Sequence, residues 1–160
     1  MRRPLAIAAF TLAVLALPRP AAADITAFVG ITPTPENRLL RGAAFGLGLL
    51  VVAFELEYAN TIEDSLEGLP GLQTGSGNLL VQTPVKVSGM QFYGTVGGSV
   101  YRERLLTRQE THYGTNLGGG AKIGLAGPLK LRLDYRIFRL QGEPLHKTYQ
   151  RFYAGANISF

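Results

Sequence analysis

The chain has 160 residues, a formal net charge of +5 and no cysteine, so it holds about one domain and has no disulfide framework. Three of its basic residues lie among the first 19 positions, and the charge therefore does not indicate nucleic-acid binding. Twenty glycines, seven tyrosines and eight phenylalanines, spread through short alternating segments, favour an all-β domain.

The first 23 residues have the three parts of a secretory signal peptide. Arginines at positions 2 and 3 open the chain, an apolar run follows over 5–17, and three alanines at 21–23 allow cleavage before Asp24. The apolar run is shorter than the roughly 20 residues that a transmembrane helix needs. We therefore predict a cleaved signal peptide over 1–23 and one domain over 24–160.

Eight later segments alternate apolar and polar side chains, as strands do when their two faces meet different environments. The clearest is 129–140, LKLRLDYRIFRL, in which leucines alternate with charged residues. Only Pro84 conflicts with a strand, since proline cannot donate to a ladder. In chain order the predicted strands are 25–32, 42–49, 52–58, 78–87, 91–102, 113–125, 129–140 and 151–160.

The connections between these segments are expected to alternate in length. The long ones cover 33–41, 59–77, 103–111 and 141–149, and the short ones lie near 50 and at 88–90 and 126–128. Strands near 9–11 residues, with short turns at one end and longer loops at the other, are typical of an up-and-down outer-membrane barrel. Both chain ends would then lie on the periplasmic side.

The polar faces carry charges that would fill the interior of such a barrel. Eight strands enclose a lumen only wide enough for side chains, and charges can persist there when they are paired. A lumen closed by ion pairs is favoured over a narrow diffusion channel. A soluble lipocalin-like periplasmic carrier is the other alternative, but its interior would be apolar. The predicted lumen charge network consists of Glu55, Glu57, Lys122, Lys130, Arg132, Asp134, Arg136 and Arg151.

Two stretches resemble those of a known family. The ending RFYAGANISF, closing on Phe160, resembles the C-terminal signature of bacterial outer-membrane barrels, which the barrel-assembly machinery reads in those proteins. The segments 118–124 and 131–136 are similar to paired late strands of small barrels of the outer-membrane protein A and X type. The resemblance implies an eight-stranded antiparallel up-and-down transmembrane β-barrel in the outer membrane of a Gram-negative cell.

For function we expect a monomer with a structural or surface-interaction role, in which the outer loops make the contacts. A lipid A acyl hydrolase would need a serine beside a histidine. No serine lies two residues from His112 or His146, and the serines inside predicted strands, Ser99 and Ser159, point to the lumen. We therefore predict no catalysis, no cofactor and no metal site, and we keep lipid A modification as an alternative.

Because alternate residues of a strand share a face, three arginines are expected on the lipid-facing side, at the outer ends of their strands: Arg41, Arg102 and Arg139. Three aromatic residues at about the same level indicate a membrane interface: Tyr58, Tyr113 and Phe152. Since guanidinium groups bind phosphate in a bidentate manner, these arginines are predicted to contact lipopolysaccharide phosphates. Ordinary snorkelling cations are the alternative.

Overall fold

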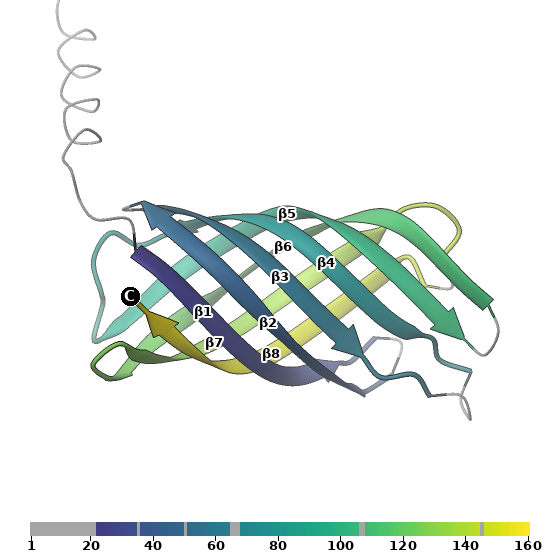
Figure 1. Ribbon diagram of the computed structural model, residues 1–160, viewed down its shortest axis with the longest axis horizontal. Coiled ribbons are helices and arrows are strands. Elements are labelled where there is room, and N and C mark those ends of the chain that lie inside the picture. Colours follow the sequence, from purple (N-terminus) through teal and green to yellow (C-terminus); the bar gives the residue numbers. More distant parts are fainter. Residues whose placement is uncertain (1–21, 35, 50, 65–67, 106–107, 145) are drawn as a thin grey trace, which may run out of the picture.

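The computed structural model describes residues 22–34, 36–49, 51–64, 68–105, 108–144 and 146–160. Eight antiparallel strands form a closed barrel in which each strand pairs with the next and β8 pairs with β1. β1 begins and β8 ends at the same end of the barrel (Figure 1). The predicted up-and-down barrel is confirmed. Its strands are β1 (Ala22–Thr32), β2 (Arg38–Leu49), β3 (Val52–Thr61), β4 (Gly71–Gln82), β5 (Met90–Leu105), β6 (Arg108–Ala126), β7 (Leu129–Leu140) and β8 (Thr148–Ser159).

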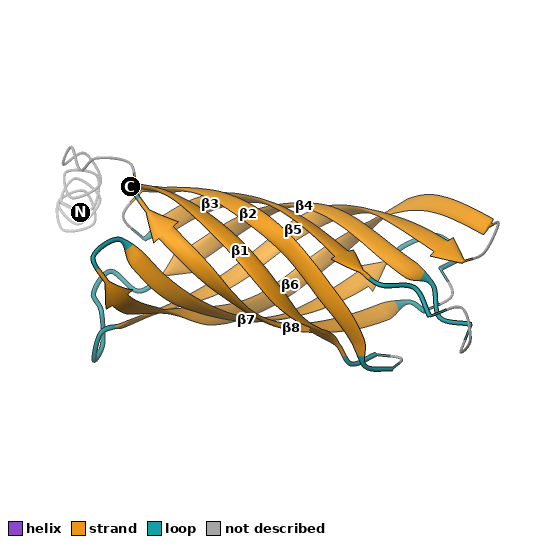
Figure 2. Ribbon diagram, turned by 60° about the horizontal axis from the view of Figure 1, so that its bottom comes forward, coloured by secondary structure: helices purple, strands orange, loops and turns teal. Residues whose placement is uncertain are grey.

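The register of the pairing determines the tilt of the strands. Stepping from Leu129 on β7 through each directly paired residue around the wall leads back to Arg139 on the same strand, ten residues further along. Such an offset requires strands inclined to the barrel axis by about 35–45°. Figure 2 shows this inclination on the near wall. The resulting interior has room for side chains only.

The two faces of the wall have opposite chemistry. Outward side chains are apolar and strongly exposed, with Leu56 at 68%. Inward side chains include fully buried charges, among them Arg132 and Arg136, both at 0%. This is the arrangement of a barrel that faces lipid outside and packs polar groups inside, and a lipocalin-like carrier has the reverse. The predicted polar, charge-paired lumen is confirmed.

Strand β4 starts earlier than predicted. The polar, glycine-rich segment 59–77 is predicted to be a loop, yet its residues 72–77 pair with the outer half of β3, with Gln73 opposite Asn60. Leu72, Thr74 and Ser76 are buried inside. Polar side chains such as Thr74 and Ser76 on the inward face, and glycines on the outward face, are compatible with a barrel wall. β4 also ends at Gln82, so that Pro84 follows the strand and breaks no ladder.

The hairpin of β5 and β6 is longer than predicted. The segment 103–111 was expected to be a loop, but β5 continues to Leu105 and β6 begins at Arg108. At the end of the barrel opposite the two described chain ends, this hairpin extends beyond its neighbours (Figures 1 and 2). The expected alternation of long and short connections is therefore wrong here. It is also wrong at 83–89, which is longer than a tight turn.

Most of the predicted signal peptide, residues 1–21, lies outside the described residues. β1 starts at Ala22, and the amide of Ala23 donates to the carbonyl of Phe160 at 2.9 Å. Cleavage before Asp24 stays a prediction. The described part of the chain contains no helix long and apolar enough to cross a membrane.

Candidate functional site

The centre of the lumen is a group of four charged side chains from β3 and β7. Alternate residues of a strand share one face, so Arg132, Asp134 and Arg136 all point inward. Asp134 accepts from Arg132 Nη2 at 3.0 Å and from Arg136 Nε at 2.9 Å. Glu55, facing them from β3, pairs with Arg132 and accepts from Arg136 Nη2 at 2.7 Å. Two cations and two anions thus compensate each other in a fully buried position.

A second layer continues this cluster toward the outer end. Glu57 Oε2 lies 3.1 Å from Arg136 Nη1 and accepts a hydrogen bond from the Tyr153 hydroxyl at 3.0 Å. Glu57 Oε1 lies 3.9 Å from Nη1 of Arg151, whose Nη2 donates to Thr74 Oγ1 at 2.7 Å. Because a buried charge is stable only when it has partners, each of these contacts constrains the next.

Tyr93 on β5 joins the central cluster from a strand that lies midway between β3 and β7. Its hydroxyl donates to Asp134 Oδ2 and accepts from Arg132 Nε at 2.8 Å. The Arg132 guanidinium also lies over the Tyr93 ring, 5.0 Å from its centroid. The tyrosine therefore positions both charged partners.

We expect Tyr93→Phe to destabilise the folded barrel by about 1–3 kcal/mol, because the buried Asp134 and Arg132 would lose a shared partner. Urea unfolding of the protein refolded in lipid vesicles measures this change. Tyr113→Phe is the control, since the Tyr113 side chain faces outward and its residue is 71% exposed. Equal stabilities of the two variants would contradict a positioning role for Tyr93.

The two ends of the lumen differ in chemistry. At the inner end Lys122 pairs with Asp24 at 2.5 Å, while half-buried Lys130 donates to Ser159 Oγ at 2.8 Å and stands apart from the central cluster. At the outer end, buried apolar and aromatic side chains pack together as an outer plug. The outer plug consists of Leu72, Tyr101, Phe138, Leu140 and Tyr149. The lumen is thus filled by charges in its middle and by this plug above them.

The structure also places inside the lumen charged residues that the sequence analysis left out. Asp24, Arg38 and Glu103 were assigned to a chain start or to connections, whereas all three lie in strands. Arg38 donates to the carbonyl of Pro70, and Glu103 accepts from the Tyr149 hydroxyl at 3.0 Å. If the strand ends had been known, the alternation of inward and outward residues would have placed these three side chains in the lumen.

The three predicted phosphate-binding arginines all lie exposed on the outer wall. Arg41 is directly paired with Asn60, which is followed in the same cross-strand row by Gln73 and then Arg102. Arg139 belongs to a different row, beside Thr115 and Thr148. Two of the three arginines therefore form one surface, and the third does not.

The histidines and serines considered for catalysis lie in separate places. His112 Nε2 is 3.5 Å from Glu110 Oε2 on the outer part of β6. Ser99 lies in the lumen, where its hydroxyl is 2.9 Å from that of Ser76. Within the described ranges, neither Ser99 nor Ser159 contacts a histidine. In the same ranges, no three histidine or carboxylate side chains gather as a metal site would require.

Comparison with known proteins gives similarity of structure alone. No protein-family model matches the chain, and no curated protein matches it. The N-terminal β-barrel domain of Pseudomonas aeruginosa OprF superposes with a TM-score of 0.69 at 16% identity, covering 87% of this chain and 97% of that domain. Neisserial surface protein A gives 0.66 at 13% identity, covering 88% of this chain and 96% of that protein.

A third similar structure is a major outer membrane protein from Thermus thermophilus. It has a TM-score of 0.65 at 11% identity and covers 89% of this chain and 100% of that protein. These identities are low, but the three folds share one architecture and cover nearly the whole barrel. The chain therefore has the fold of the small eight-stranded transmembrane barrels found in outer membranes.

Proposed function

We propose that the protein is a monomeric barrel of the Gram-negative outer membrane with a structural or surface-interaction role. The observation that carries this proposal is the filled lumen. Buried ion pairs occupy the middle of the barrel and the outer plug packs above them, which leaves the outer surface and the loops for contact. The apolar outer wall supports placement in a membrane.

The outer end of the barrel would make the contacts with other molecules. The extended hairpin of β5 and β6 carries exposed charged residues such as Arg102 and Arg104. Its lipid partner would be lipopolysaccharide, approached by the outward arginines. During biogenesis β8 and the exposed Phe160 that follows it would be read by the barrel-assembly machinery.

Electrophoresis of the outer-membrane fraction, boiled and unboiled, tests this proposal. We expect a heat-dependent shift in migration, because a closed barrel resists detergent until it is heated. In planar bilayers we expect no stable single-channel conductance, because side chains fill the lumen. Stable conductance would support the diffusion-channel alternative. A soluble protein without a shift would contradict placement in the membrane, and altered lipid A mass spectra would support the enzyme alternative.

A further inference from the structure

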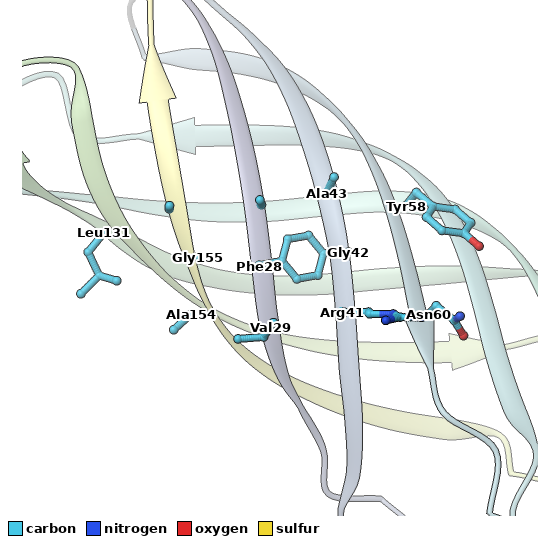
Figure 3. A pocket seen from close by; sticks show the side chains of 12 residues that line it. Phe28, Val29, Arg41, Gly42, Ala43, Tyr58, Asn60, Leu131, Ala154 and Gly155 are labelled. Atoms are coloured by element: carbon cyan, nitrogen blue, oxygen red, sulfur yellow. The ribbon is translucent and has the colours of Figure 1, made fainter.

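A groove of about 800 Å³ lies on the lipid-facing wall and extends from β7 over β8, β1 and β2 to β3 (Figure 3). Elsewhere this wall carries large apolar side chains such as Phe54 and Leu56. Here alanines take the outward positions, so the surface is hollowed. The outward alanines that line the groove are Ala27, Ala43, Ala154 and Ala156, and the inward-facing positions between them include Gly42 and Gly155.

The floor of the groove is closed from the inside by Phe28. This ring is buried in the lumen, stacks on Tyr153 with centroids 4.1 Å apart, and lies directly behind Gly42. A Cβ atom at Gly42 would overlap the Phe28 ring. The groove is therefore a fixed depression with an apolar floor, separated from the lumen charges.

One end of the groove is polar. Arg41 and Asn60, directly paired across β2 and β3, lie side by side there (Figure 3). The other end is formed by Leu131, near the end of the barrel where β7 begins. An occupant with a polar head at Arg41 would thus extend its apolar part toward the middle of the wall, as a membrane lipid does.

Arg41 lies among apolar neighbours that face lipid. Leu39 and Ile31, directly paired with each other, are 55% and 44% exposed and stand between Arg41 and the outer end of the wall. In the described part of the chain, Arg41 forms no ion pair. An arginine that faces lipid destabilises a barrel, most at the midplane of the membrane and less near the interface, and a bound anion offsets this cost.

The row that starts at Arg41 provides a second cation. Asn60 pairs with Gln73, and Gln73 pairs with Arg102, all on the outward face. Measured along the wall, the backbones of Arg41 and Arg102 are therefore three strand spacings apart, about 14 Å, with two amide side chains between them. A ligand with two anionic groups joined by a hydroxyl-rich linker matches this arrangement, whereas a lipid with one phosphate would reach only one arginine.

We propose that this row and the groove together bind a bisphosphorylated, multiply acylated glycolipid of the outer leaflet. Its phosphates contact Arg41 and Arg102, its sugar contacts Asn60 and Gln73, and one acyl chain occupies the groove. The assignment rests on the proposed outer-membrane location. Arg139, which lies in another row, takes no part.

Native mass spectrometry of the detergent-solubilised barrel with added bisphosphoryl lipid A, monophosphoryl lipid A or phosphatidylglycerol tests this site. We expect the strongest retention of bisphosphoryl lipid A. Arg41→Gln and Arg102→Gln should each weaken it about tenfold or more, since each removes a charge-assisted contact. Ala43→Phe, which fills the groove without changing charge, should also weaken it.

Two controls match these changes. Arg139→Gln removes an outward charge outside the row, and Leu117→Phe enlarges an outward side chain outside the groove. Both should bind bisphosphoryl lipid A as the unmodified protein does. The site is wrong if the Arg41 and Arg102 variants retain the lipid unchanged, if Arg139→Gln weakens binding equally, or if Ala43→Phe has no effect.

The heat-dependent shift separates failure of this site from failure of the proposed function. All five variants alter outward side chains, and each should keep the shift that marks a folded barrel. If the shift is present but Arg41→Gln and Arg102→Gln retain the lipid as the unmodified protein does, only the glycolipid site is contradicted. If the unmodified protein shows no shift, both proposals are contradicted.

Discussion

Arg136→Met is expected to destabilise the folded barrel by about 3–5 kcal/mol, the usual cost of breaking a buried ion pair by removing one partner. The guanidinium of Arg136 contacts Asp134, Glu55 and Glu57, and its Nη2 donates to the Tyr153 hydroxyl at 3.2 Å. Methionine fills a similar volume, so the change removes charge and leaves no large cavity. Three buried carboxylates would then share fewer cations in the lumen.

Urea unfolding in lipid vesicles measures this loss, and Arg139→Met is the matched control. Arg139 lies three residues further along β7 but faces outward and is exposed, so the same substitution there should change stability by less than about 0.5 kcal/mol. Similar unfolding of the two variants would show that the lumen ion pairs do not stabilise the barrel.

The network need not stabilise the barrel relative to an apolar interior of equal volume. Replacing a whole buried ion-pair cluster with hydrophobic residues is often neutral or stabilising, even though breaking it is costly. The charges make the inward face of β7 chemically different from its lipid-facing side. A register slip of one residue would turn Arg132 and Arg136 toward lipid, so the cluster disfavours wrong pairings of β7.

Strand parity was enough to assign most side chains to a face. Because successive residues alternate, the inward positions of Glu55 and Asp134 and the outward position of Arg41 follow from short local patterns. Strand ends were harder to predict. Gln73 and Glu103 lie in segments that look like loops, and they become strands because the neighbouring strand offers free backbone groups to pair with.

Contacts between distant strands could not be predicted from local patterns. Lys122 and Asp24 are 98 residues apart in the chain and meet only because pairing of β1 with β8 closes the barrel and brings β1 within three strands of β6 around a narrow lumen. Likewise, the alternation of residues along each strand places Arg41 and Arg102 on the outward face. Only the register of three successive strand pairings shows that they share a row with Asn60.

Gly97→Val is expected to abolish folding, whereas Gly98→Val should be tolerated. The two glycines are adjacent on β5 but face opposite sides of the wall. A Cβ atom at Gly97 would overlap Asn78 Oδ1 and the carbonyl oxygen of Gly77, whereas a Cβ atom at Gly98 would meet nothing within 4 Å. The two valine variants therefore compare how tightly the lumen is packed with how tightly the lipid-facing side is packed.

The clash at Gly97 is severe because two inward side chains meet across this residue. Asn116 Nδ2 on β6 donates to Asn78 Oδ1 on β4 at 2.9 Å, and Asn78 Nδ2 donates in turn to Glu55 Oε1 at 3.3 Å. Valine would separate the two asparagines and push the backbone of β4 away, breaking the ladder and leaving buried polar groups unpaired. The fraction of heat-shifted protein after refolding measures the outcome. Equal folding of the two valine variants would mean that the lumen is loosely packed at this level, and the closed barrel would then have space there for water.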